Sequence, residues 1–149
     1  MASTAVRQDR VTTRLAELDA IRDVYTGAAD RLATGWTQGR WRSSEGVCLV
    51  GAIRLQARGQ LSARALDVLW HARYDDTVDV GWVPPREIRL ARVRDLTRWN
   101  DARDRTVQDV LGLLATADRY ARDEMVRLRD ELGLVVSGRR ERPTTRPAA

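Results

Sequence analysis

The chain has 149 residues, of which 43% are hydrophobic and 32% charged, and its formal net charge at pH 7 is +5. This length suits one domain, which buries roughly 68–70% of the surface that its unfolded chain exposes. The single cysteine, Cys48, excludes an internal disulfide, and no run approaches the roughly 20 apolar residues of a membrane-spanning helix. We therefore expect a soluble, cytoplasmic protein with no membrane association.

The positive charge is concentrated near the C-terminus. Residues 137–149 hold four Arg and one Glu, which is +3 of the net +5, so residues 1–136 carry only +2. The same stretch is rich in Pro and Thr, a composition typical of disorder. We predict a single helical domain over 1–136 followed by a disordered basic tail over 137–149.

Apolar residues recur every three or four positions over 5–34, which predicts a long amphipathic helix. Gly35 follows the last of them and is a typical helix stop. Residues 36–46 are punctuated by Gly and Ser and predict an irregular loop that holds Trp36 and Trp41.

Three shorter helices are expected in the middle of the chain. The first covers about 46–58, with Ser44 as its N-cap and Gly59 as its stop, and "LSARALDVLWHARY" forms the second, capped by Ser62. An acidic connection ends at two prolines that suit the first turn of a third helix over 85–99. In the second and third of these helices, the residues expected to face the core are Leu66, Leu69, Trp70, Tyr74, Ile88, Ala91, Leu96 and Trp99.

The final helix is predicted over 106–132. Thr106 and Asp109 have the spacing of a capping box, and Gly133 is the expected stop. At 1.5 Å per residue this helix is about 40 Å long, which is about the diameter of the domain, so it spans or overhangs the globule. We predict an all-α fold of about five helices, in which the two long terminal helices pack antiparallel.

Three pieces of the sequence occur together in a known family: "GWTQG", "GVCLVGAIRLQA" and "WNDARDRTVQDVLGLLATA". Over about 28–117 the chain resembles a domain-of-unknown-function family of small proteins, frequent in actinobacteria and also met in their phages. The matching residues are Gly35, Trp36, Gln38, Gly39, Gly46, Cys48, Gly51, Ala52, Trp99, Asn100, Asp101, Arg105 and Thr106. The resemblance indicates where a site lies, but it implies no particular reaction.

Cys48 has two interpretations. Near a helix N-terminus a thiol can have a lowered pKa, and Cys48, His71 and Asn100 or Asp101 follow the chain order of a Cys–His–Asn hydrolase. However, the spacing of His71 from Asp67 and Asp75 places it on a charged, exposed helix face. We favour a structural role, in which Cys48 is a small buried residue beside Gly51 and Ala52.

Asn100 and Asp101 precede the final helix, where short polar side chains often cap backbone groups. With Gln38 and Arg105 they form either a ligand-binding clamp or a structural lock between the loop and the final helix, and we favour the lock. Asp101 also has the spacing of an ion pair with Arg105. Trp36 and Trp41 are candidates for partner contact, and their spacing suggests that at least one is exposed.

Two charged clusters remain. Arg86, Arg89 and Arg92 share one helix side and could follow phosphates, although a solvated, ion-paired face is the favoured interpretation. Asp75, Asp76 and Asp79 lack the glycine and terminal glutamate of a calcium loop, so no metal or cofactor is predicted.

The leading hypothesis is a helical protein-binding or regulatory module, with its site at the 35–48 loop and the 99–106 turn, and with a protein partner or self-association. The site residues are Trp36, Gln38, Trp41, Asn100, Asp101 and Arg105. One alternative is a cysteine-dependent hydrolase or transferase, for which Cys48 is the only catalytic candidate; it requires an accessible thiol beside a base. The other is weak nucleic-acid binding through the Arg-rich tail.

Overall fold

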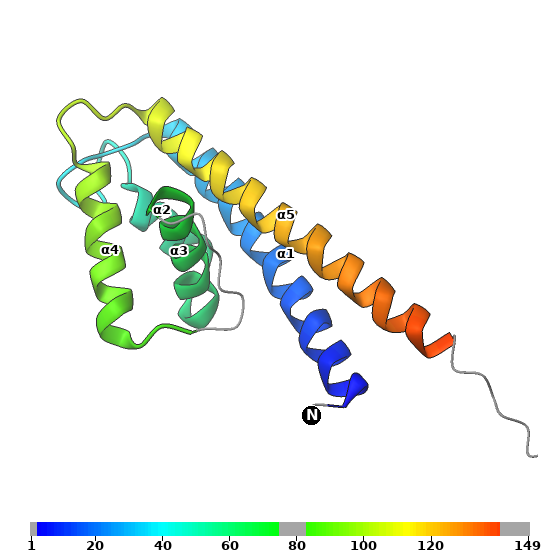
Figure 1. Cartoon of the computed structure of the whole chain (residues 1–149). Helices are drawn as coiled ribbons and strands as arrows, with labels where there is room; N and C mark the ends of the chain where they lie inside the picture. Colours follow the sequence, from blue (N-terminus) through cyan, green and yellow to red (C-terminus); the bar gives the residue numbers. More distant parts are fainter. Residues whose placement is uncertain (1–2, 75–82, 141–149) are drawn as a thin grey trace, which may run out of the picture.

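The computed structural model describes residues 3–74 and 83–140, with side chains up to residue 133. Within these ranges the chain forms five helices, and its only strand-like pairings are isolated bridges at Val47 (Figure 1). The helices are α1 (Thr4–Thr34), α2 (Leu49–Gln56), α3 (Gly59–Tyr74), α4 (Arg86–Asn100) and α5 (Val107–Arg140). The predicted all-α fold is confirmed. Among the described residues, no helix is both long enough and apolar enough to cross a membrane.

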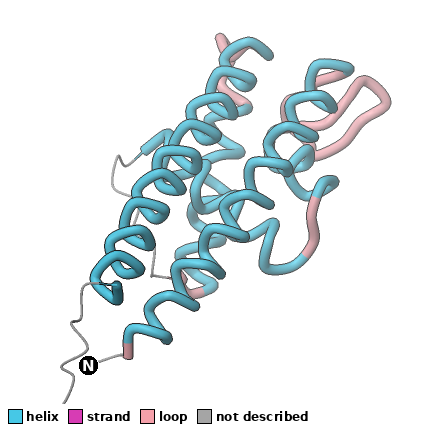
Figure 2. Tube along the Cα trace, turned by 90° about the vertical axis from the view of Figure 1, so that its right-hand side faces the viewer, coloured by secondary structure: helices cyan, strands magenta, loops and turns pink. Residues whose placement is uncertain are grey.

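The two long helices lie side by side and run in opposite directions, as predicted (Figures 1 and 2). Arg7 near the start of α1 forms an ion pair with Glu131 late in α5 at 2.7 Å, and Arg22 pairs with Asp118 at 2.9 Å. The shorter helices pack against one half of this pair, so the start of α1 and the end of α5 project beyond them (Figure 1). The expected overhang is therefore present.

The apolar stripes of the long helices meet in the core. Their buried residues are Val11, Leu18, Ile21, Val24, Tyr25, Ala28 and Leu32 from α1, and Val110, Leu113, Leu114, Ala117, Ala121, Met125 and Leu128 from α5. The hydroxyl of Tyr25 donates a hydrogen bond to the carbonyl of Ala65 at 2.7 Å, which joins α1 to α3. The predictions for Ile88 and Tyr74 were wrong, because both side chains are more than a third exposed.

Several predicted helix ends were wrong. Cys48, and not Ser44, caps α2, because residues 43–47 are hydrogen-bonded within the loop before the helix begins. Gly59 starts α3 instead of stopping α2, and Ser62 lies inside α3. Helix α5 continues through Gly133 to Arg140, into the stretch assigned to the tail, since one glycine costs a helix only about 1 kcal/mol. Residues 141–149 lie outside the described part.

The predicted capping box at the start of α5 is confirmed. The carboxylate of Asp109 accepts from the Thr106 backbone N–H at 2.9 Å, and the Thr106 hydroxyl accepts from the Asp109 N–H at 3.2 Å. The paired bonds satisfy two N–H groups that the first helical turn would leave without partners.

The loop between α1 and α2 closes tightly on itself. Val47 donates its N–H to the carbonyl of Gly35 at 3.1 Å and accepts from the Thr37 N–H at 3.0 Å. A Cβ on Gly46 would lie 2.2 Å from the carbonyl carbon of Gly35, and a Cβ on Gly51 would lie 2.5 Å from the carbonyl oxygen of Trp41. These glycines let the loop backbone touch itself and the first turn of α2.

Replacing Gly51 by Ala should lower the free energy of unfolding by about 1–3 kcal/mol, because the new methyl group meets backbone that cannot move aside. Gly112→Ala is the matched control, since nothing lies within 4 Å of the Cβ position there, and it should raise stability by about 0.5–1 kcal/mol. Urea unfolding followed by circular dichroism measures both. Equal changes in the two variants would contradict the close approach at Gly51.

Candidate functional site

The side chain of Asn100, the last residue of α4, lies at the centre of the predicted junction and is only 1% exposed. Its Oδ1 accepts from the indole N–H of Trp36 at 2.8 Å and from the backbone N–H of Leu49 at 3.1 Å. Its Nδ2 donates to the carbonyl of Thr37 at 3.2 Å and to the carboxylate of Asp101 at 2.9 Å. All four hydrogen-bonding positions of the amide are used, so one residue joins α4, the loop and α2.

Two neighbouring side chains reinforce this junction. The Nε2 of Gln38 donates to the carbonyls of Asn100 and Ala102, both at 2.9 Å. The carboxylate of Asp101 accepts from the backbone N–H of Gly39 at 2.9 Å. Trp36, Gln38, Asn100 and Asp101 together are called the polar clamp below.

Arg105 lies beside the polar clamp and makes different contacts from those that its spacing suggested. Its Nε donates to the carbonyl of Trp99 at 2.8 Å, and its guanidinium carbon lies 4.1 Å from the centre of the Trp99 ring. It therefore holds the 99–106 turn against the end of α4, and its hydrogen bond goes to a carbonyl and not to Asp101.

Trp41 is apart from the polar clamp. Its side chain is 49% exposed, whereas Trp36 is partly buried. The guanidinium carbon of Arg54, on α2, lies 4.0 Å from the centre of the Trp41 ring. The structure thus divides the predicted site into a hydrogen-bonded network around the buried Asn100 and a separate, exposed aromatic side chain.

Cys48 is buried, with 2% of its surface exposed. Its sulfur accepts the backbone N–H of Gly51 at 3.3 Å, so the thiol acts as the N-cap of α2. Burial raises the pKa of this thiol, and hydrogen bonds from backbone N–H groups only partly oppose that rise. These surroundings favour the protonated thiol over the nucleophilic thiolate. The buried Cys48 is therefore not the accessible thiol that the enzymatic hypothesis requires.

The expectation that His71 is exposed was wrong. Only 6% of its surface is exposed, and its Nε2 lies 3.4 Å from a guanidinium nitrogen of Arg92. Arg92 also forms an ion pair with Asp67 and stacks over Trp70 at 4.2 Å. This buried charged cluster joins α3 to α4, and in the sequence its only signals were the four-residue spacing of Asp67 and His71 and the arginine stripe.

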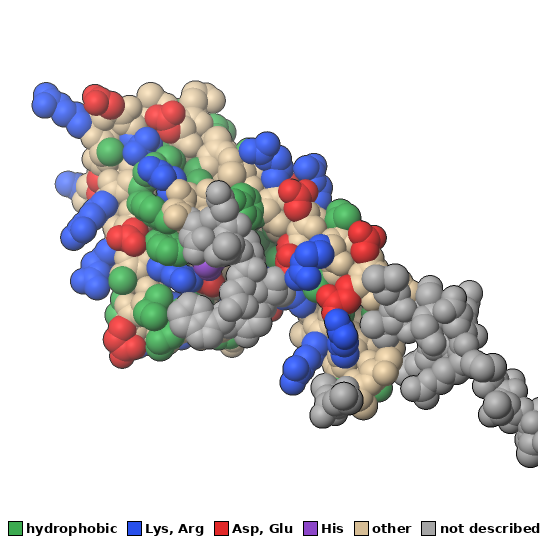
Figure 3. Space-filling view, viewed as in Figure 1, with side chains coloured by type: hydrophobic (Ala, Val, Ile, Leu, Met, Phe, Trp, Pro, Cys, Tyr) green, Lys and Arg blue, Asp and Glu red, His purple; other side chains and the backbone are tan. Residues whose placement is uncertain are grey.

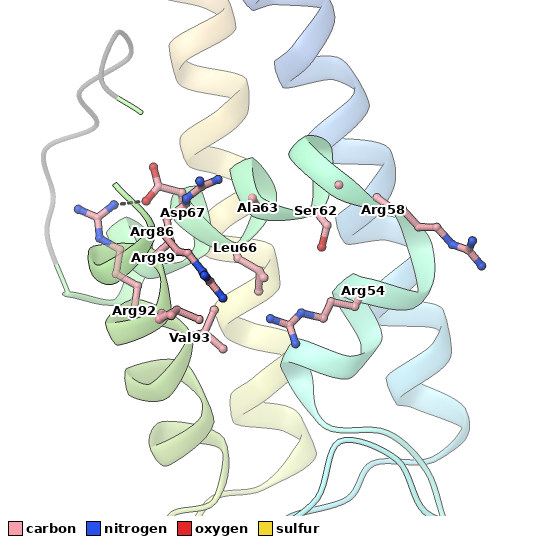
Figure 4. A pocket seen from close by; sticks show the side chains of 13 residues that line it. Arg54, Arg58, Ser62, Ala63, Leu66, Asp67, Arg86, Arg89, Arg92 and Val93 are labelled. Carbon is pink, nitrogen blue, oxygen red and sulfur yellow. Dashed lines mark hydrogen bonds and ion pairs between the residues drawn. The ribbon is translucent and has the colours of Figure 1, made fainter. Parts of the chain in front are cut away.

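A cavity of about 420 Å³ opens between the α2–α3 corner and the first half of α4, and sequence analysis did not predict it (Figure 4). Arg86, Arg89 and Arg92 share one helix side, as expected, and all three line this cavity. Of the favoured interpretation, a solvated and ion-paired face, the ion pair is present at Arg92, which contacts Asp67, but the solvated part was wrong there because Arg92 is only 9% exposed. The acidic cluster Asp75, Asp76 and Asp79 lies outside the described residues.

Replacing Asn100 by Asp should lower the free energy of unfolding at pH 7.5 by about 2–4 kcal/mol, because a carboxylate oxygen would replace the amide donor that faces two oxygen acceptors. Gln108→Glu makes the same chemical change at an exposed position near the start of α5 and should have almost no effect. Urea unfolding curves of the two variants and the parent test this, and a mild effect of Asn100→Asp would contradict the four-bond geometry.

The Cys48 thiol of the folded protein should react with iodoacetamide about 100-fold more slowly, or slower still, than the thiol of the urea-unfolded chain, because burial hinders access and raises its pKa. The pH midpoint of alkylation should lie above that of the unfolded chain. Mass spectrometry of quenched samples measures both quantities. A fast native reaction with a lowered midpoint would restore the enzymatic hypothesis.

Comparison with known proteins identifies the family of this chain. No curated protein and no solved structure matches the chain significantly. Residues 16–120 match a family of unknown function, DUF6197. The match includes the polar clamp, Cys48 and every residue lining the cavity. The resemblance to a domain-of-unknown-function family is confirmed, and the chain belongs to the DUF6197 family.

Proposed function

We propose that this protein is a small cytoplasmic binding module, and that its partner is an acidic protein segment with apolar anchor residues. The contact surface is the exposed part of the 35–48 loop with the adjoining turn of α2. The observation that carries the proposal is Trp41, a large aromatic side chain that is 49% exposed on a loop whose backbone is fixed by hydrogen bonds at Thr37, Gly39 and Trp41.

The polar clamp is not itself the contact surface, but it holds the loop that forms this surface. The hydrogen bonds of Asn100, Gln38 and Asp101 go to groups of the protein itself. A partner that used the amide of Asn100 would have to break existing bonds, each of which contributes to stability. The clamp therefore acts as a scaffold that fixes the shape of the loop.

Trp41 is held in place before any partner arrives. Its carbonyl accepts the N–H of Cys48 at 3.0 Å, the missing side chain of Gly51 gives this carbonyl room, and Arg54 stacks on its ring. An anchor that is already ordered loses little entropy on binding. Tryptophan is also among the residues that contribute most to binding at protein interfaces.

The surroundings of Trp41 define the partner's chemistry. Arg40 and Arg42 flank it in the sequence and are exposed, and Arg54 covers part of its ring. Leu55, next to Arg54, is 50% exposed and adds apolar surface. A basic and aromatic surface complements a segment that combines carboxylates with a large apolar side chain.

Trp41→Ala should weaken binding of a suitable acidic peptide by about 30-fold, the effect of losing a central aromatic anchor. The probe is a set of fluorescein-labelled 12-residue peptides in which Leu pairs are placed among Glu residues, measured by fluorescence anisotropy. Peptides with Lys in place of Glu should bind at least about tenfold more weakly.

Val126→Ala is the control for this experiment. Val126 is 50% exposed on α5, so its truncation removes an equally exposed apolar side chain elsewhere on the molecule. It should leave peptide binding unchanged. Equal binding of acidic and basic peptides, or equal effects of the two truncations, would reject the proposal.

A further inference from the structure

The cavity beside α4 combines apolar walls with arginine side chains. Its described lining includes the apolar residues Ala63, Leu66 and Val93 and the arginines Arg54, Arg86 and Arg89. Figure 4 shows Arg54 reaching from α2 toward Leu66 and Val93, while Arg58 points away. In the space-filling view, arginine side chains stand along α4 next to exposed hydrophobic ones (Figure 3).

The described lining of this cavity carries more positive than negative charge. The one carboxylate in that part of the lining, on Asp67, forms an ion pair with Arg92. Within residues 3–74 and 83–133, Arg54, Arg86 and Arg89 form no ion pair with any carboxylate. Burial also lowers the pKa of Arg54, so this guanidinium is partly removed from water. Cations that converge at reduced hydration are stabilised by an anion between them.

We propose that this cavity binds a small amphiphilic anion, whose carboxylate or phosphate head lies between Arg54 and Arg89 and whose aliphatic part packs on Leu66 and Val93. Guanidinium groups bind both kinds of head through paired N–H donors. A volume of about 420 Å³ falls within the roughly 300–1,000 Å³ of small-molecule sites. The described lining contains no aromatic ring to stack on a nucleobase, which favours an aliphatic ligand.

This site is separate from the proposed protein-binding surface, although Arg54 contributes to both. Arg89 lines the cavity from α4 and has no contact with Trp41 among those that the structure shows. Substitution of Arg89 therefore tests the cavity without disturbing the aromatic anchor. Either proposal can fail while the other stands.

Isothermal titration calorimetry on the full chain tests the cavity with four probes: decanoate, decyl phosphate, decanol and inorganic phosphate. Decanoate and decyl phosphate are used below their micelle concentrations, and decanol below its solubility limit. We expect at least one of the two amphiphilic anions to bind about tenfold or more tightly than decanol, because only the anions offer a head to the arginines. Inorganic phosphate should bind more weakly than decyl phosphate. The stronger of decanoate and decyl phosphate identifies the preferred head.

Arg89→Gln should weaken anion binding by about tenfold or more, and Arg94→Gln, at an exposed position of α4 outside the cavity, should leave it unchanged. Ala63→Phe, which fills the apolar wall, should weaken both the anions and decanol. Circular dichroism confirms that each variant is folded. Binding of decanol equal to that of both anions, or equal effects of the two arginine substitutions, would overturn the proposal, as would the absence of binding by both anions.

Discussion

The rest of the structure depends on the amide of Asn100. Its four hydrogen bonds reach the loop through Trp36 and Thr37, the start of α2 through Leu49, and the neighbouring Asp101. Because the amide is buried, loss of any partner leaves a polar group without water or protein to satisfy it. The amide therefore fixes the end of α4, the loop and the start of α2 as one unit.

This constraint has consequences at the surface. Once the loop is fixed, Trp41 must lie outside the core, where its carbonyl meets the first turn of α2 at Gly51. Arg54, one turn further along α2, then lies between the exposed Trp41 ring and the cavity beside α4. Arg54 stacks on the Trp41 ring and also lines the cavity, so the two proposed sites are physically connected through one side chain.

Much of the fold follows from patterns that are local in the sequence. The three- and four-residue spacing of apolar residues predicted α1 and α5, and their lengths predicted that they would pair and overhang. The order of short motifs predicted that Trp36, Gln38, Asn100 and Asp101 lie close together, and the structure shows hydrogen bonds among them or their backbones. Helix ends were harder to predict, because the usual residue preferences favour neither cysteine as an N-cap nor glycine inside a helix such as α5. The cavity and the Asp67–Arg92 pair depend on how α3 packs against α4, and no local pattern contains that packing.

The most direct test of the central role of Asn100 is hydrogen exchange of the tryptophan indoles by NMR. The indole N–H of Trp36 donates to Asn100, whereas Trp41 is half exposed. The account predicts that the Trp36 indole and the Leu49 amide exchange only through opening of the domain, and that the Trp41 indole exchanges freely. If the Trp36 indole exchanged as fast as that of Trp41 in the folded protein, the clamp would not be the constraint that organises this structure.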